Sequence, residues 1–343
     1  MIRKEQPMSD TMIGPIGDLQ LESGAVLKNA VLAYTTEGTL AADRLNVVLL
    51  THGYTSSHLM MGSANSEGPW SGLVGPGKAV DTNRFFVIAA NMLGSSYGST
   101  APMSVNPDTG KAYGPDFPAI TLKDIVTAQK QLLESLGISH LTAVIGPSYG
   151  GFQAFTWAGV YPDWMDAIVP SVSGLTSPGD VNRAENIKRL SLDPNWNNGH
   201  YYGNGGVADA MTALRDKTLR RYGAEAELAG HLPDKAAVTA EIRRRAEAWA
   251  RSFDAHSLLV LGDAAARYDA TPLIPNMKAR VLYVLSRTDA LFPPTLAPDV
   301  MAKLRAAGLD ATYFEIDSDH GHLAAGTDAA KWAPTLNAFM DRL

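Results

Sequence analysis

Apolar runs of strand length alternate along the chain with longer segments whose apolar residues recur at helical spacing. Buried strands are predicted at residues 46–51, 85–93, 141–145, 165–172, 279–286 and 311–316. Helices are predicted at 121–136, which stops at Gly137, at 152–161 and at 328–343. Strands that alternate with helices indicate an α/β protein with a mostly parallel sheet and helices on both of its faces.

Two regions depart from this alternation of strands and helices. At the amino terminus we expect an irregular arm up to Gly17, followed by two antiparallel strands at 18–21 and 30–36. Between 173 and 275 the segments are polar, contain Trp and Tyr, and are helical at 208–222, 235–253 and 257–267. We interpret this second region as a helical cap set above the site. The predicted domains are therefore a core of residues 1–172 and 276–343 and a cap insertion of 173–275.

A turn between a predicted strand and a predicted helix carries the strongest chemical signal. Residues 146–150 read Gly-Pro-Ser-Tyr-Gly and match G-x-S-x-G with Ser148 at its centre. Strand, G-x-S-x-G and helix in succession are what the nucleophile elbow of the α/β-hydrolase fold requires. Residues 94–98 match the same pattern around Ser96, but a long loop follows them instead of a helix. Ser148 is therefore the predicted nucleophile, and Ser96 is predicted to be a loop residue.

A serine nucleophile needs a base, and the base needs a carboxylate that orients it. In α/β-hydrolases the acid and then the histidine follow later strands. Asp289 follows the strand at 279–286, and both His320 and His322 follow the strand at 311–316. The chain order does not choose between the two histidines. Backbone N–H groups of Tyr54, after the strand at 46–51, and of Tyr149 are the predicted oxyanion donors.

Composition narrows the classes of function. The 343-residue chain has a net charge of −6 and no basic stripe, which argues against a nucleic-acid partner. It contains no cysteine, so disulfides and thiolate chemistry are excluded. No cluster has convincing zinc spacing and no loop resembles a nucleotide cradle, so we expect neither a metal nor a cofactor. With no signal-peptide run and no apolar stretch of about 18 residues, we expect a cytoplasmic protein without a membrane partner.

From about Leu49 to Gly321 the chain resembles the homoserine O-acetyltransferase-like branch of the α/β-hydrolases. The resemblance rests on segments that follow the family pattern closely: 51–58, 75–102, 106–138, Asp193-Pro194-Asn195-Trp196, Phe253-Asp254-Ala255 and 318–322. It implies that Ser148 is the nucleophile, Asp289 the acid and His322 the base, with His320 where the family usually has Tyr. It also implies an acyl-enzyme formed from acetyl-CoA, and a homodimer that associates through the cap.

The chain departs from this family where the amino-acid acceptor would bind. Leu323 follows His322, where the transferases have an Asp that receives the acceptor's ammonium group. The family's cap Arg for the acceptor's carboxylate has no counterpart in register. Arg215 and Arg220 are the nearby candidates, and His58 is a further candidate for lining the pocket.

These observations predict an acyl-Ser148 enzyme. Its main predicted function is hydrolysis of a small ester or thioester. The first alternative is an O-acyltransferase that moves an acyl group from acyl-CoA to a hydroxyl acceptor. A second alternative, of another class, is a binding protein that uses the α/β-hydrolase scaffold without catalysis.

Overall fold

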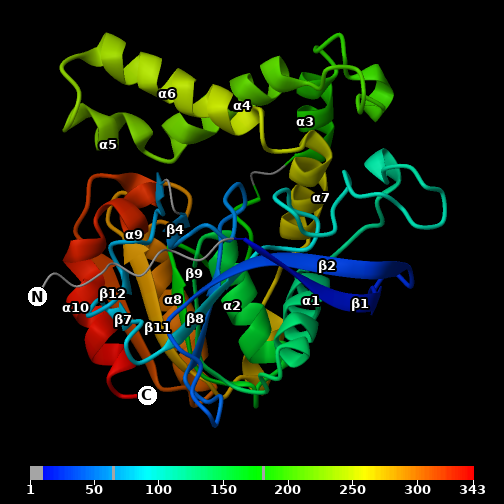
Figure 1. Ribbon diagram of the computed structural model, residues 1–343. Coiled ribbons are helices and arrows are strands. Elements are labelled where there is room, and N and C mark those ends of the chain that lie inside the picture. Colours follow the sequence, from blue (N-terminus) through cyan, green and yellow to red (C-terminus); the bar gives the residue numbers. More distant parts are fainter. Residues whose placement is uncertain (1–10, 64–65, 180–181) are drawn as a thin grey trace, which may run out of the picture.

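The computed structural model describes residues 11–63, 66–179 and 182–343. An eight-stranded sheet in the order β1-β2-β8-β3-β9-β10-β11-β12 forms its centre (Figure 1). The strands of this sheet are β1 (Met12–Gln20), β2 (Val26–Glu37), β3 (Val47–Thr51), β8 (Phe86–Ala90), β9 (Leu141–Pro147), β10 (Met165–Ser171), β11 (Arg280–Ser286) and β12 (Ala311–Ile316). All pairs from β8 to β12 are parallel, whereas β1 and β2 are antiparallel to their neighbours. The predicted α/β-hydrolase sheet is thereby confirmed.

Alternating side chains of the central strands divide the core into two layers. Leu49, Val144 and Ile168 belong to one apolar cluster, whereas Leu50, Ile145 and Val169 belong to the other. This alternation follows from the two-residue period of a strand whose two faces are both covered. The helices α1 (Leu122–Ser135), α2 (Tyr149–Val160) and α8 (Ala297–Ala306) pack in the first cluster, and α9 (Ala324–Thr327) and α10 (Ala329–Met340) pack in the second.

The first strand is longer than the sequence indicates. β1 begins at Met12 and pairs with β2, so the expected irregular arm up to Gly17 is wrong for the described residues from Met12 onward. Register shifts on both sides of Gly17 interrupt the alternation of polar and apolar residues, which conceals the strand in the sequence. Residues 1–10 of the arm lie outside the described residues.

Between β10 and β11 the chain forms helices that lie above the carboxyl ends of the strands (Figure 1). They are α3 (Arg183–Leu190), α4 (Ala208–Arg221), α5 (Ala224–Ala229), α6 (Lys235–Ala250) and α7 (Ala255–Ala266). Helices α4, α5 and α6 share a small apolar cluster of their own, whereas α7 is buried in the first core cluster. Arg243, Arg244 and Arg245 each pair with a glutamate on the exposed side of α5 or α6, as expected for a solvated helix face.

Short elements complete the fold around the site. The loop after β3 contains the two-stranded pairs β4 (Gly62–Ser63) with β5 (Ser66–Glu67) and β6 (Val74–Gly75) with β7 (Val80–Asp81). No helix in the described part of the chain is both long and apolar enough to cross a membrane.

Candidate active site

The turn from β9 into α2 holds Ser148 in an unusual backbone conformation. Its φ of 55° lies in the left-handed region, which strains a residue other than glycine and is typical of functional sites. Gly146 and Gly150 permit the sharp turn, because a Cβ on either would lie 2.1 or 2.5 Å from atoms of Thr51 in β3. The close approach of β3 and α2 therefore raises the serine side chain out of the sheet.

Three side chains from separate loops meet at this turn. His322 Nε2 lies 2.8 Å from Ser148 Oγ, and His322 Nδ1 lies 2.8 Å from Asp289 Oδ2. The His322 and Asp289 side chains are only 5% and 0% exposed. Asp289 Oδ1 accepts hydrogen bonds from the backbone N–H groups of Leu291 and Phe292, which fixes the carboxylate. The arrangement orients one imidazole nitrogen toward the acid and leaves the other to accept the serine proton.

The choice between the two histidines follows from this geometry. His320 Nδ1 lies 3.1 Å from Asp328 Oδ2, whereas His322 is the histidine that contacts Ser148 Oγ, so the geometry favours His322 as the base. Its backbone N–H donates to Ser318 Oγ, which in turn hydrogen bonds to Asp328. Thr288 Oγ1 donates to Ser318 O and accepts from Gly321 N–H. These contacts connect the loops that carry Asp289 and His322.

The cap rests directly on the histidine loop. Gly223, between α4 and α5, has a φ of 98°, and a Cβ there would lie 2.6 Å from His320 O. The N–H of Leu323 donates to Tyr222 O at 3.3 Å. The Tyr222 ring also lies 4.8 Å from the imidazole of His322, measured between centroids. The cap therefore forms one wall around the base.

The loop after β3 lies beside the serine. A Cβ on Gly53 would be 3.9 Å from Ser148 Cβ, which places the neighbouring Tyr54 backbone at the site. His52 is fully buried, accepts from Met92 N–H at Nε2 and contacts Gly53 O through Nδ1. Burial lowers the pKa of His52 to about 4, so it is neutral at pH 7 and acts structurally. Tyr149, as the first residue of α2, presents its N–H at a helix amino terminus.

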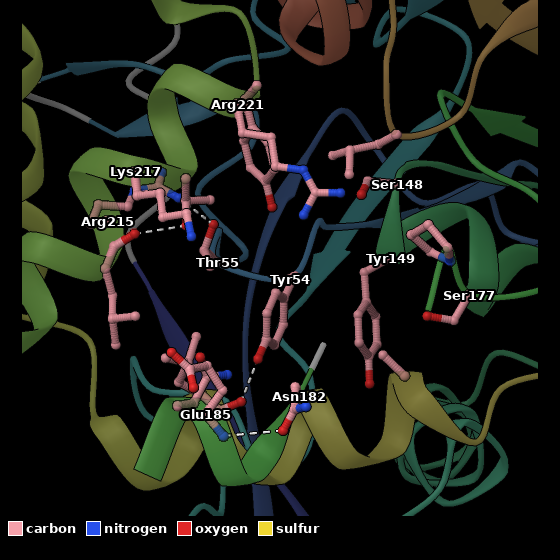
Figure 2. A pocket seen from close by; sticks show the side chains of 18 of the residues that line it. Tyr54, Thr55, Ser148, Tyr149, Ser177, Asn182, Glu185, Arg215, Lys217 and Arg221 are labelled. Atoms are coloured by element: carbon pink, nitrogen blue, oxygen red, sulfur yellow. Dashed lines mark hydrogen bonds between the residues drawn. The ribbon is translucent and has the colours of Figure 1, made fainter. Parts of the chain in front are cut away.

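Two cavities meet at Ser148. We name the first the cap cavity; it has a volume of about 210 Å³ and lies between Tyr149 and the helices α3 and α4 (Figure 2). The stacked rings of Tyr54 and Tyr149, with centroids 5.8 Å apart, stand beneath the serine in this view. The lining of the cap cavity includes four cationic residues, Arg189, Arg215, Lys217 and Arg221, and the carboxylate of Glu185.

We name the second cavity the side channel; it has a volume of about 710 Å³. It extends from Ser148 and His322 past Met60 and Trp70 to the exposed Ala330. Five residues line both cavities: Tyr54, Thr55, Ser148, Arg215 and Tyr222. The reacting serine is thus reached from two sides.

Arg215 stands where the two cavities meet. Its Nη1 donates to Thr55 Oγ1 at 2.6 Å (Figure 2). Its guanidinium lies 5.0 Å from the ring centroid of Trp249. Its Nε is buried without a hydrogen-bond partner, and no carboxylate of the described residues pairs with it. Burial lowers the pKa of this guanidinium. An unpaired buried cation is costly, so the position favours an anionic ligand.

The other candidates from the sequence lie as follows. Leu323 lines the side channel beside His322. His58 is buried, contacts Thr11 Oγ1 through Nε2 and lines neither cavity. Arg220 pairs with Asp216 and Glu225 and also lines neither cavity. The structure thus brings Arg215 and Leu323 to the serine and places His58, Arg220 and His320 elsewhere.

Ser96, the centre of the second G-x-S-x-G match, has a structural place. It is fully buried, and its Oγ accepts from the backbone N–H of Asp254 at the start of α7. Tyr222, Thr55 and Trp249 also lie at the site, although the sequence does not predict their roles there. Nothing in the sequence brings Trp249 of α6 to Arg215 of α4, because their contact depends on how the cap helices pack. No group of three metal-binding side chains occurs among the residues that the structure describes.

Comparison with known proteins agrees with this geometry. The family described as alpha/beta hydrolase fold matches residues 46–329. A homoserine O-acetyltransferase of Moorella thermoacetica is 34% identical, covering 95% of this chain and 94% of the relative. The chain belongs to the homoserine O-acetyltransferase-like family of α/β-hydrolases. The resemblance on which the sequence analysis rests is confirmed, and the chain is a serine enzyme of this fold.

Relatives within the homoserine O-acetyltransferase-like family differ in their named reactions. A homoserine O-succinyltransferase of Leptothrix cholodnii is 35% identical, covering 95% of this chain and 94% of the relative. Among solved structures, esterase E22 has a TM-score of 0.87 at 30% identity and covers 97% of this chain and 100% of its own. The homoserine O-acetyltransferase of Bacillus anthracis has a TM-score of 0.89 at 25% identity, with 98% of each chain covered. Named relatives therefore support acyl transfer, our first alternative, better than the predicted hydrolysis.

Proposed function

We propose that this enzyme is an O-acyltransferase that carries an acyl group on Ser148 and passes it to the hydroxyl of a small carboxylate-bearing acceptor. The arrangement of Ser148, His322 and Asp289 at 2.8 Å contacts supports the acyl-serine intermediate. The guanidinium of Arg215, which pairs with no carboxylate of the described residues and lies in the lining that both cavities share with Ser148, is the observation that carries the acceptor class. The acyltransferases among its relatives support transfer as the second half of the reaction.

In the first half-reaction, His322 Nε2 takes the proton of Ser148 as Oγ bonds to the acyl carbon of an acyl-CoA or an ester. The backbone N–H groups of Tyr54 and Tyr149 stabilise the oxyanion. The bond to the leaving thiol or alcohol breaks, and His322 returns the proton to it. In the second half-reaction, the acceptor hydroxyl gives its proton to His322 and attacks the acyl carbon, and Ser148 leaves with that proton.

Leu323 and Arg215 together define the acceptor. A carboxylate beside Arg215 supplies the anion that this guanidinium lacks in the protein. Beside His322, Leu323 is apolar and no acidic residue lines the side channel in the described part of the chain, whereas Glu185 in the lining of the cap cavity pairs with Arg189. An ammonium group next to His322 would be desolvated there without a counter-charge. A hydroxy acid without an amino group therefore fits better than homoserine.

Hydrolysis is the second candidate function. Esterase E22 has nearly the same fold over the whole chain, and Leu323 removes the acidic group that an amino-acid acceptor would need. In this case water takes the place of the acceptor, and the acyl-Ser148 intermediate yields a carboxylic acid. All catalytic groups are shared by the two functions.

A set of three acceptors tests the proposal. Purified enzyme is given acetyl-CoA or p-nitrophenyl acetate with homoserine, 4-hydroxybutyrate or 1-butanol, and products are identified by mass spectrometry. We expect O-acetyl-4-hydroxybutyrate as the main product, because this acceptor has the carboxylate and no ammonium. If acetate forms at a rate that no acceptor changes, the enzyme is a hydrolase and the transfer proposal is wrong. Absence of turnover and of fluorophosphonate labelling at Ser148, with Ser148→Ala as control, would leave only the binding-protein alternative.

A further inference from the structure

The side channel is chemically unlike the cap cavity, although both reach Ser148. The cap cavity is lined by the cationic residues Arg189, Arg215, Lys217 and Arg221. Only Arg215, at the shared inner end, is a charged residue among the described residues that line the side channel. Between this inner end and the exterior, the lining consists of small and apolar residues, among them Met60, Trp70, Val172 and Leu323, together with the uncharged hydroxyl residues Ser56, Ser71 and Thr327. Such a lining favours an apolar ligand group.

Small residues let the two walls of this channel approach each other closely. Its two walls are the loop at 68–72 and the segment at 325–330, and the facing residues Gly68, Gly72, Ala325, Gly326, Ala329 and Ala330 have almost no side chain. The walls approach closely, because a Cβ on Gly326 would lie 2.6 Å from Pro69 O. Larger side chains at these positions would reduce the space between the loop and the helix segment.

The wall of the channel is preformed by buried aromatic and aliphatic side chains. Trp70 and Met60 are 1% and 2% exposed, and Trp70 packs edge-on against Trp332 with ring centroids 5.9 Å apart. The N–H of Trp70 donates to Met60 O at 2.9 Å, which joins the two wall residues. These side chains present almost no surface of their own but hold the wall of the channel in place, so a ligand that enters loses little binding energy to rearrangement.

We propose that the side channel is the binding site for the acyl chain and that it takes chains much longer than acetyl, of about eight carbons. The inference rests on the proposed acyl-Ser148 intermediate. Eight carbon-sized groups, each occupying roughly the volume of a water molecule, need on the order of 240 Å³. The channel, at about 710 Å³, has room for such a chain. The acceptor then enters through the cap cavity and binds at the inner end that both cavities share, beside Arg215 and the base.

A chain-length series tests this assignment. The kcat/KM of the enzyme is measured with p-nitrophenyl acetate, butyrate, hexanoate and octanoate, which are all cleaved through the same two half-reactions with water as acceptor. Each methylene buried against the channel wall contributes about fourfold to kcat/KM. We expect octanoate to exceed acetate by at least tenfold. Turnover of acetate without any preference for longer chains would overturn the channel assignment and leave the acyl-serine proposal intact, whereas absence of all turnover would overturn that proposal itself.

Variants that narrow one cavity or the other test where the acyl chain binds. Ala330→Trp, at an exposed position at the outer end of the channel, should lower the ratio of kcat/KM for octanoate to that for acetate more than tenfold. Ala338→Trp, at an exposed position of the same helix outside the channel, is the matched control and should change neither value. Gly72→Val, which brings a new side chain against Ala329, provides a second channel variant. Leu214→Trp narrows only the cap cavity, so a loss of octanoate preference in this variant instead would overturn the proposal.

Discussion

Asp289 Oδ2 contacts His322 Nδ1 at 2.8 Å, and neither side chain has appreciable contact with solvent. The carboxylate therefore selects the tautomer in which Nε2 is free to accept the proton of the serine. Asp289→Asn keeps the shape of the side chain but no longer favours this tautomer of His322. We expect kcat to fall about 10³–10⁴-fold with little change in thermal stability. The control is Asp319→Asn, which removes an exposed carboxylate in the loop that carries His322. A loss of less than tenfold for Asp289→Asn would exclude this role.

Arg215 should strengthen binding of the acceptor and lower the stability of the ligand-free protein. Replacement by Met removes a charge-assisted contact to the acceptor's carboxylate, which is worth about 1.5–3 kcal/mol or roughly a tenfold to hundredfold rise in KM for 4-hydroxybutyrate. Because no carboxylate pairs with Arg215 in the free protein, the melting temperature should not fall. Arg220→Met, one turn further along α4 and outside both cavities, should leave this KM unchanged. Equal KM values in the two variants would disprove the assignment of Arg215.

Leu323 should control the choice between acceptors. Leu323→Asp places a carboxylate beside His322, where it can pair with the ammonium group of homoserine. We expect the rate with homoserine, relative to that with 4-hydroxybutyrate, to rise at least tenfold, since a charge-assisted contact of about 1.5–3 kcal/mol is gained. Leu323→Asn has nearly the same shape and no charge. If Asn and Asp changed the ratio alike, charge recognition at this position would be refuted.

Buried histidines should make the protein sensitive to mild acid. Burial lowers the pKa values of His52 and His58 from about 6.5 to about 4. The unfolded chain therefore binds more protons than the folded protein between these values, so stability is complete above pH 6.5 and falls as the pH drops toward 4. His52 alone should account for about 3 kcal/mol at pH 4.

Urea unfolding at pH 7.5, 6 and 5 measures this effect. His52→Gln should flatten the decline with pH relative to the unaltered protein, even if it lowers stability at pH 7.5. His231→Gln, at an exposed position of the cap, serves as the control and should retain the original slope. An identical decline in all three proteins would show that protonation of His52 does not cause it.

Local patterns sufficed for the parts of the fold and site that depend on short stretches of chain. The apolar runs predicted the central strands, and the strand–turn–helix context singled out Ser148 over Ser96. The order of later loops predicted Asp289. It did not separate His320 from His322, because both follow the same strand and only their side-chain directions differ. The family resemblance chose His322, and the 2.8 Å contact to Ser148 Oγ agrees with that choice.

Long-range packing accounts for what the sequence did not predict. The part of β1 before Asp18 escaped prediction because its irregular register near Gly17 breaks the polar–apolar alternation. The place of Arg215 depends on Thr55 and Trp249, which come from two other elements and have no spacing rule that connects them to α4. The side channel is defined by small residues of a loop and a helix segment, and small residues by themselves predict no cavity. Such features arise only when the cap and the loops pack together.

The contact of Gly223 with the carbonyl of His320 links the cap to the segment that carries the catalytic base. This contact and the hydrogen bond from Leu323 to Tyr222 join the α4–α5 junction to the segment that carries the base. A cap that moves outward far enough to break both contacts also releases that segment, so the imidazole loses its alignment with the serine. The position of the cap and the alignment of the base with the serine therefore depend on each other through these two contacts.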